Sequence, residues 1–491
     1  MTKIKLVIAR EIKDSRGNPT IEVELETNKG SFVASVPSGA STGKNEALEL
    51  RDSSPTNFGL GGKEQKSDLN LKLVGNKDGK GVSNAIFNVN KIIAPKLKNR
   101  DVTEQVKIDE FLIELDGTEN KSKLGANAIS AVSMTVCRAG AGAKKIPLYR
   151  HISELSFSHI YAPMRESEKK GVGLPLFIPL PMFNILEGGA HVHPQTKRDD
   201  MVDENTEKYG SRSDVGASND LDIQEFMVVP QKKTFAENLI TGSKIFQNLK
   251  EILVKNYGEK GTIMGDEGGF APPISSTQQA LYLLKSAIGE NNDVNPVRGQ
   301  GDLTGKIKKQ TSNGVKIAID CAASQFYKNG KYLLEGKELT RFGLLDFYKD
   351  LAQRFPIIFI EDPFAEEDWE GFRQITKELS SKISIIGDDL TTTNIKRIKE
   401  AHNKSACNGI ILKLNQIGTV SETIEAAKLA KSFGWKTIVS HRSGETLDNF
   451  IADLAVGVGS DFIKSGSPTK EERMVKYNRL LQIESELIVK H

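Results

Sequence analysis

The sequence predicts an α/β protein in which an eight-fold (β/α) barrel follows a smaller N-terminal segment. One observation is a series of short apolar runs from residue 223 onward, each meeting a charged or polar residue. Another is their even spacing, because intervals of 27, 25, 28 and 23 residues separate the successive positions Glu361, Asp388, Lys413, His441 and Lys464. Each interval accommodates one strand, one helix and two loops, and about eight such units close into a barrel.

Eight runs fit this description, and each has a length typical of a buried strand. They read "IQEFMVVP" (223–230), "TIMGDEGGF" (262–270), "KIAIDCAAS" (316–324), "IIFIEDP" (357–363), "SIIGDDL" (384–390), "GIILKLNQ" (409–416), "TIVSHRS" (437–443) and "DFIKSGS" (461–467). Because the C-terminal strand ends of such a barrel lie on one rim, we expect their charged residues to converge there.

The N-terminal segment has a different pattern. Residues 20–27 alternate between apolar and polar side chains and residues 30–37 follow a Lys-Gly turn, which predicts two strands. Residues 125–143 are rich in small side chains and long enough for a packed helix. The change of pattern near residue 145 predicts an N-terminal domain over 1–145 and a barrel domain over 146–491.

Composition excludes several classes of protein. The chain has 491 residues, and its net charge of +3 gives no electrostatic reason to expect nucleic acid or a membrane surface as a partner. No apolar run reaches the roughly 18 residues of a membrane span, and the N-terminus has no signal-peptide pattern. Cys137, Cys321 and Cys407 have neither metal-ligand nor disulfide spacing, so we expect a reduced, cytoplasmic protein.

Four segments interrupt the pattern of strands and helices. They are polar and rich in Gly, Asn, Asp, Lys or Ser, and we expect them to be surface loops inserted into a compact scaffold. They cover residues 61–78, 156–173, 192–221 and 290–313.

Three carboxylates stand at consecutive predicted strand ends, at Asp320, Glu361 and Asp388. Converging carboxylates repel one another, and a hard divalent cation such as Mg²⁺ relieves that repulsion. Each residue taken singly could instead cap a helix or pair with a base, but three in succession favour a metal site. Lys413 and Lys464 point to the same rim, either as a general base near the metal or as counter-ions for the carboxylates.

Three loops offer further groups for binding a ligand. The loop "SHRSGE" (440–445) combines an imidazole, a guanidinium and two hydroxyls, of which Arg442 and Ser443 suit a phosphate or a carboxylate. The loop "GDEGG" places Glu267 among glycines, which allows the backbone to approach a ligand closely. The loop "PSGASTG" is rich in N–H and hydroxyl donors and is a candidate lid.

These residues lie within motifs by which the chain resembles the enolase family over nearly its whole length. The motifs are "DSRGNPTIEVE", "VPSGASTG", "EALELRD", "GANAISAVS", "QEFMVVP", "GDEGGFAP", "FIEDPF", "GDDL", "LKLNQIGT", "SHRSGET", "IKSGSP" and "KYNRLLQIE". The resemblance implies an N-terminal α+β capping domain on a modified eight-fold (β/α) barrel. It also implies assembly as a homodimer or a higher homo-oligomer.

The resemblance further implies an activity, the reversible dehydration of the small molecule 2-phosphoglycerate to phosphoenolpyruvate, with two Mg²⁺ ions in each active site. By motif, Asp320, Glu361 and Asp388 correspond to ligands of the first Mg²⁺, and Ser41 corresponds to a ligand of the second. Two divalent ions suit this reaction, because they stabilise the dianion that forms when the weakly acidic proton next to a carboxylate is removed.

The motifs also imply how the protons are transferred. Lys413 corresponds to the base that takes the C2 proton, and Glu267, supported by Glu225, corresponds to the acid that protonates the leaving hydroxyl. Hydroxide is a poor leaving group, so the reaction needs an acid opposite the base. The residues that the resemblance places against the substrate are His191, Glu225, Lys413, His441, Arg442, Ser443 and Lys464.

The chain departs from the family's usual pattern at four points. Glu187 stands where asparagine is usual, Ala190 where serine is usual, and Gln325 where glutamate is common. His191 and Glu225 are 34 residues apart, so an enlarged loop enters the region expected to close over the substrate. One alternative is a non-catalytic scaffold that uses its insertions as contact sites, and another is a superfamily member acting on a different carboxylate. The complete catalytic set favours an active enzyme.

Overall fold

The structure, a computed structural model, describes residues 1–39, 43–52, 79–157, 176–192, 219–289 and 314–489. Ser41 and most of the four predicted insertions lie outside these residues. The enlarged loop after His191 re-enters the described chain at residue 219, and Leu221 is already buried. The end of the predicted insertion 192–221 therefore belongs to the packed body and not to a surface loop.

The N-terminal part is built on a three-stranded antiparallel sheet of β1 (Leu6–Lys13), β2 (Pro19–Thr27) and β3 (Gly30–Ser35), in that order. The small residues of α4 (Ala126–Lys144) let this helix pack closely on β2 and β3. The strands and the long helix that the sequence predicts in this part are confirmed. The other helical segments here are α1 (Ser83–Phe87), η1 (Asn88–Ile93), α2 (Ala94–Leu97), α3 (Gln105–Asp116) and α5 (Leu148–Ser156).

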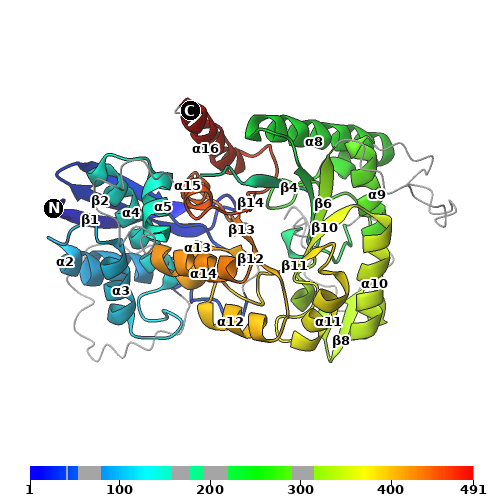
Figure 1. Ribbon diagram of the computed structural model, residues 1–491, viewed down its shortest axis with the longest axis horizontal. Helices are drawn as coiled ribbons and strands as arrows, with labels where there is room; N and C mark the ends of the chain where they lie inside the picture. The colour runs from blue at the N-terminus through cyan, green and yellow to red at the C-terminus, as the bar shows by residue number, and fades with distance from the viewer. Residues whose placement is uncertain (40–42, 53–78, 158–175, 193–218, 290–313, 490–491) are drawn as a thin grey trace, which may run out of the picture.

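Eight strands close into a barrel in the order β10-β11-β12-β13-β14-β4-β5-β6, which confirms the predicted fold class (Figure 1). The strands are β4 (Leu180–Glu187), β5 (Glu225–Pro230), β6 (Val315–Asp320), β10 (Ile357–Glu361), β11 (Ser384–Gly387), β12 (Gly409–Leu412), β13 (Lys436–Ser440) and β14 (Phe462–Lys464). All neighbouring pairs are parallel except those that β5 makes with β4 and β6, which are antiparallel.

Two details of the predicted barrel are wrong. The run 262–270 is not a barrel strand, because it forms a loop in which only single bridges join Met264 and Leu186 to Phe270. The eighth strand of the barrel is β4 instead. The sequence does not predict β4, because Pro179 and Pro181 lie at its start and proline inside an apolar run argues against a strand. The sheet is also not parallel throughout, because β5 runs antiparallel to both of its neighbours. None of the described residues between β4 and β5 forms an α-helix, whereas two helices, α8 and α9, lie between β5 and β6.

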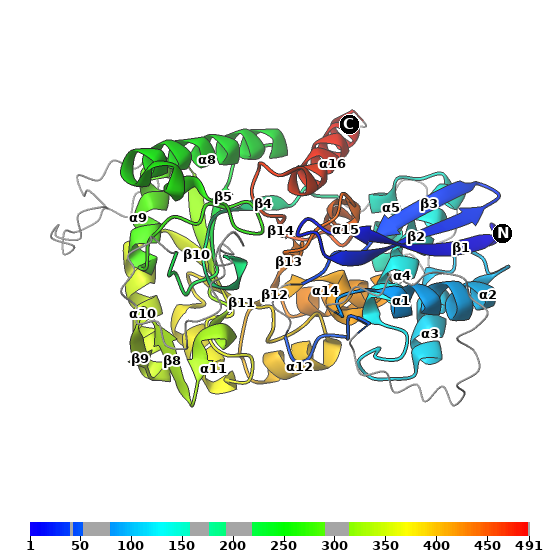
Figure 2. The same cartoon turned by 180° about the vertical axis from the view of Figure 1, so that it is seen from behind.

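Helices cover the outside of the barrel, as Figures 1 and 2 show from opposite sides. They are α8 (Phe235–Tyr257), α9 (Thr277–Ile288), α10 (Arg341–Arg354), α11 (Trp369–Leu379), α12 (Ile395–Asn403), α14 (Val420–Ser432), α15 (Phe450–Gly457) and α16 (Glu471–Ile488). A small sheet of β7 (Tyr327–Lys328), β8 (Lys331–Leu334) and β9 (Lys337–Leu339) follows β6. Within the described ranges, no helix has the length and apolarity that crossing a membrane requires.

A layer of apolar side chains fills the interior of the barrel, and every strand contributes to it. Its members are Met182, Met227, Val229, Ala318, Phe359, Ile386, Ile411, Ile438 and Phe462. Side chains alternate between the two faces of a strand, so residues two positions further along each strand also point inward. The next inward position toward the rim is therefore where the barrel can display polar groups to a ligand.

Polar contacts fix the N-terminal part against the barrel. Arg138 of α4 donates to both carboxylate oxygens of Asp448, at 2.6 and 2.8 Å. Nearer the barrel mouth, the backbone groups of Ser38 and Gly444 exchange hydrogen bonds of 2.8 and 2.9 Å. These contacts hold the segment next to the candidate lid against the loop that carries Arg442.

Candidate active site

A ring of mostly charged side chains lies two positions beyond the apolar layer, at the rim where the parallel strands end. One residue comes from each strand or from the position directly after it: Asn184, Glu225, Asp320, Glu361, Asp388, Lys413, Ser440 and Lys464. We call this set the polar ring. Glu225 belongs to it although it begins its strand, because the antiparallel β5 starts opposite the last residue of β6, Asp320.

The ammonium group of Lys464 lies among three carboxylates of the polar ring. Its Nζ atom is 3.1 Å from Asp320, 3.0 Å from both oxygens of Glu361 and 3.1 Å from Glu225, and all four side chains are buried. Burial and the charge of Asp320 raise the pKa of Glu361 well above its ordinary value. Burial lowers the pKa of Lys464, but the three carboxylates outweigh burial and raise it well above its ordinary value.

Lys413 forms a second ion pair in the polar ring, with Asp388. The other carboxylate oxygen of Asp388 accepts a hydrogen bond of 2.9 Å from the Gln416 side chain. Burial disfavours the ammonium form of Lys413, but the negative charge of Asp388 outweighs burial, so the net effect raises the pKa of Lys413. A lysine in this state holds its proton for as long as Asp388 keeps its full negative charge.

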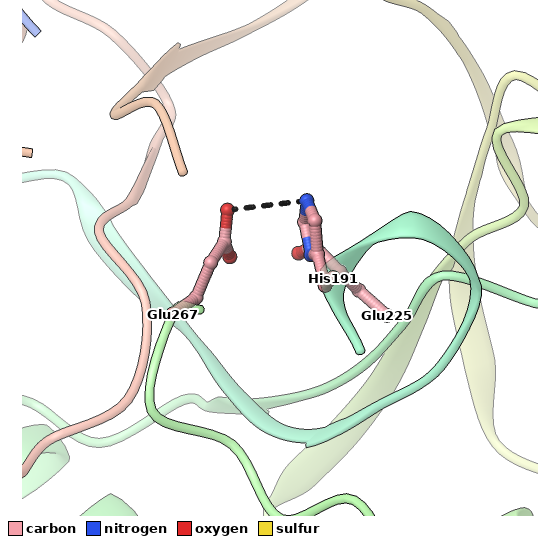
Figure 3. A group of neighbouring side chains, drawn as sticks. All are labelled: His191, Glu225 and Glu267. Atoms are coloured by element: carbon pink, nitrogen blue, oxygen red, sulfur yellow. Dashed lines mark ion pairs between the residues drawn. The ribbon is translucent and has the colours of Figure 1, made fainter. Parts of the chain in front are cut away.

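Glu267 reaches the barrel mouth from the loop after η3 (Gly258–Thr262), near the start of β5. Its carboxylate lies 3.7 Å from His191 Nε2 and 3.0 Å from His441 Nε2, and it accepts a hydrogen bond of 3.0 Å from the Asn184 side chain. Figure 3 shows Glu267 and His191 pointing toward each other. The Nδ1 atom of the same histidine lies 3.8 Å from the Glu225 carboxylate. This side of the mouth is opposite Lys413, because β5 and β12 are four places apart in a ring of eight strands.

Glu225 and Glu267 differ in their affinity for a proton. Burial raises the pKa of Glu267, but the neighbouring His441 and His191 outweigh it and bring the pKa well below its ordinary value. Burial and the charge of Glu267 raise the pKa of Glu225 well above its ordinary value. Within the described part of the chain, Glu225 Oε2 is a buried oxygen without a hydrogen-bond partner. This oxygen can therefore carry a proton close to Glu267.

Arg473 of α16 fixes the orientation and the tautomer of His441. Its guanidinium donates to His441 Nδ1 at 2.6 Å, and it also donates to the main-chain oxygens of Arg442 and Ser443, at 2.7 and 2.6 Å. Because Nδ1 accepts from an arginine, a neutral His441 carries its proton on Nε2, the atom that faces Glu267. Burial lowers the pKa of His441 to about 4, so the ring is neutral at pH 7.

Arg442 is held at the mouth by the segment that precedes the barrel. Its guanidinium lies 2.9 Å from Glu46 Oε2 and donates to Asn415 Oδ1 at 3.1 Å. Gly39 allows this contact, because a side chain there would collide with the guanidinium. Ser443, the other predicted phosphate ligand, is buried directly after Arg442, while Ser41 lies outside the described residues.

Acidic side chains at the mouth form clusters that could hold a metal ion. Ligand atoms lie within 4.8 Å of one another in two groups, His191 with Glu225 and Glu267, and Asp362 with Asp388 and Asp389. Of the predicted ligands, Asp320 and Glu361 share the Lys464 ammonium group, and Asp388 pairs with Lys413. The three predicted ligands offer oxygen atoms from neighbouring strands and carry more negative charge than two ammonium groups balance, which fits a hard cation such as Mg²⁺.

Comparison with protein families gives two matches along the chain. Residues 4–152 match the enolase N-terminal domain, and residues 212–490 match the enolase C-terminal TIM barrel domain. The chain belongs to the enolase family. Membership in this family supports a lyase of the enolase superfamily that acts on a small molecule. The domain division at residue 145 stays a prediction.

Several residues at the barrel mouth are not among those that the sequence predicts. Asn184 could have been found, because it stands two positions after the inward-pointing Met182 of a strand, but the strand itself was missed. Arg473 gave no signal in the sequence, and Glu46 stands in the motif "EALELRD" without a predicted role, because each reaches the mouth from outside the strand ends. The roles predicted for the site residues remain proposals, although the structure brings all of them except Ser41 to one end of the barrel.

Proposed function

We propose that this chain catalyses the reversible dehydration of 2-phosphoglycerate to phosphoenolpyruvate in a Mg²⁺-dependent reaction. The observation that supports this most directly is the placement of an ammonium group, Lys413, and a carboxyl group, Glu267, on opposite sides of one buried polar ring. Removal of a proton from one face of a substrate and protonation of a leaving group on the other require such an arrangement. A cytoplasmic location and a homo-oligomeric state belong to the proposal and rest on the sequence.

Lys413 acts as the base for the C2 proton. The charge of Asp388 keeps Lys413 protonated, so the lysine becomes a base only when that charge is taken up by another cation. Asp320, Glu361 and Asp388, with Ser41 for a second ion, would hold Mg²⁺. When bound, Mg²⁺ stabilises the negative charge that develops on the substrate carboxylate as C2 loses its proton.

Glu267 protonates the hydroxyl that leaves from C3. It needs a proton for this step, although its histidine neighbours favour the ionised form. Glu225, whose pKa is raised by burial and by Glu267, retains a proton beside it. In the reverse direction, ionised Glu267 accepts the proton of the attacking water, so the pair serves both directions.

Arg442 and Ser443 bind the phosphate, and Lys464 and His191 complete the substrate contacts. A guanidinium that already makes two contacts, with Glu46 and Asn415, is held in place for a phosphate oxygen. His441 carries its Nε2 proton toward Glu267 and orients that carboxylate.

The test is an assay of the purified chain with 2-phosphoglycerate, in which formation of the enol phosphate is followed with Mg²⁺ and after exhaustive chelation. We expect turnover that depends on the metal and is lost in Lys413→Ala. Glycerate, which lacks the phosphate, should not react. Turnover of a non-phosphorylated carboxylate instead would assign the chain to another reaction, and no turnover of either would contradict the proposal.

A further inference from the structure

The side chain of Glu187, at the end of β4, is enclosed by the loop that carries Glu267. It is completely buried. Its Oε1 atom accepts a hydrogen bond of 2.5 Å from the N–H of Gly269, and its Oε2 atom accepts one of 3.2 Å from the N–H of Glu267. The backbone of the proposed acid is thus bonded directly to the Glu187 carboxyl group.

The loop 265–269 has the form of a turn closed around this carboxyl group. Gly265 and Gly269 join through a backbone hydrogen bond of 2.9 Å, and Gly268 adopts a positive φ of 88° between them. A Cβ atom on Gly269 would lie 2.8 Å from Glu187 Oε1, and one on Gly265 would collide with Oε2. The glycines therefore leave room for a carboxyl group, and converging backbone N–H groups make an anion-binding concavity.

A carboxyl group suits this position better than an amide. Two N–H donors converge on it, and each needs an acceptor. A carboxylate has two acceptor oxygens, whereas a glutamine in the same place would turn its NH₂ group toward one of the donors. Both hydrogen bonds need the carboxyl group of Glu187. None of the roles proposed for the other site residues accounts for this group.

Building on the proposed function, we propose that Glu187 is a positioning residue for Glu267, because its carboxyl group holds the backbone of the acid in place. Two carboxyl groups that interact strongly in a buried site share their protons as a pair. Burial and the charge of Glu267 raise the pKa of Glu187 well above its ordinary value, so the pair retains a proton to higher pH than Glu267 would alone.

Other charged and titratable groups face this pair from four elements. They are His191 of the short helix η2 (Gly189–His191), Glu225 of β5, His441 after β13, and Lys470 and Arg473 at the start of α16, together with Asp266 in the loop itself. Arg473 and the two histidines favour the ionised form of Glu267. Glu187 opposes them, because it is a second carboxyl group and lies within hydrogen-bonding distance of the backbone of the same loop.

The variant Glu187→Gln keeps the shape of the side chain but loses one hydrogen bond and the second acidic group. We expect dehydration of 2-phosphoglycerate to slow by roughly 10- to 100-fold with little change in KM, which corresponds to the loss of one hydrogen bond to a charged group. Exchange of the C2 proton with solvent should be retained, because Lys413 carries it out. The alkaline limb of the dehydration rate should move to lower pH, because Glu267 then loses its proton more easily.

The matched control is Asn219→Ala. Asn219 donates at 2.9 Å to the main-chain oxygen of Glu187, so its loss perturbs the same backbone without touching the carboxyl group. We expect turnover, exchange and the pH profile of this control to match the parent. Equal losses of turnover and exchange in both variants would show a purely structural role and overturn the proposal, as would an unchanged turnover in Glu187→Gln.

A readout without substrate separates this inference from the proposed function. The amide protons of Glu267 and Gly269 should resonate downfield in the parent chain, and at least one of them should move upfield in Glu187→Gln, because a glutamine side chain has only one acceptor oxygen. If 2-phosphoglycerate is not a substrate but these shifts are seen, the proposed reaction fails and the positioning of Glu267 stands. If the shifts are absent, Glu187 does not hold the loop.

Discussion

Lys464 and Glu361 are 103 residues apart in the sequence, yet the Lys464 ammonium nitrogen lies 3.0 Å from both oxygens of the Glu361 carboxylate. Both side chains are buried, and Asp320 and Glu225 contact the same nitrogen. Neutralising buried carboxylates requires a cation close by. The ammonium group of Lys464, on β14, thus contacts carboxylates from β5, β6 and β10. This is the point where we propose that the substrate and a metal ion bind.

Replacing Lys464 with methionine should destabilise the fold when no divalent metal is added. The three carboxylates then lose their counter-ion, and breaking a buried pair costs about 3–5 kcal/mol of unfolding free energy. The deficit should shrink as the pH falls, because protonation neutralises the carboxylates. Urea unfolding at several pH values measures it, and Lys436→Met, which removes a half-exposed ion pair with Asp461, is the control. A variant as stable as the parent would show that the three carboxyl groups are not charged together.

Lys413 and Glu267 should have separable roles in the two proton transfers. Lys413→Ala should slow the exchange of the C2 proton by about 10²- to 10⁴-fold, the usual contribution of a general base. Glu267→Gln should block dehydration and retain exchange, because the base is still present. Solvent-isotope exchange followed by NMR, alongside turnover, measures both steps. The exposed pair Lys428 and Glu425 provides matched Lys→Ala and Glu→Gln controls. The opposite pattern of losses would reverse the two assignments.

Arg442→Lys should weaken the binding of phosphorylated substrate. A lysine retains the charge but cannot contact Glu46, Asn415 and a phosphate from one planar group. We expect KM for 2-phosphoglycerate to rise by roughly 10- to 100-fold, which corresponds to the loss of a hydrogen bond to a charged group. Arg354→Lys controls for the substitution itself, because this arginine of α10 is bonded to Asp350 on its own helix and to Tyr282 of α9. An unchanged KM would exclude Arg442 as a phosphate ligand.

His151 should make the fold sensitive to acid. Burial lowers its pKa to about 3, and both ring nitrogens are buried without a hydrogen-bond partner in the described part of the chain. The unfolded chain binds a proton at this histidine below about pH 6.5, whereas the folded chain does so only near pH 3. Stability therefore falls as the pH drops through this window, by about 1.4 kcal/mol per pH unit.

The variant His151→Met isolates this contribution. Its unfolding free energy should fall less steeply than that of the parent between pH 6.5 and pH 4, while the two chains differ little above pH 7, where the histidine is neutral in both states. Denaturant titrations at stepped pH give the two slopes. Identical slopes would mean that His151 is protonated in the folded chain.

The sequence alone predicted the barrel and most of the polar ring. Parallel strands joined by helices of similar length bring their C-terminal ends to one rim, so Asp320, Glu361, Asp388 and the two lysines could be expected to meet. The enolase motifs then supplied roles for these residues. The repeating length of the strand–helix units is enough to place these strand ends on one rim, without knowledge of how distant segments pack.

The tertiary structure alone decided where the groups outside this repeat lie. Glu225 reaches the rim because β5 runs antiparallel, a direction that the apolar run does not encode. Arg473 and Glu46 arrive from a helix and a loop far away in the sequence, and only their packing brings them to His441 and Arg442. Glu187 was visible in the sequence only as an unusual residue. Its contact with the acid loop follows from how the chain folds back over β4, because hydrogen bonds between distant segments leave no periodic signal in the sequence.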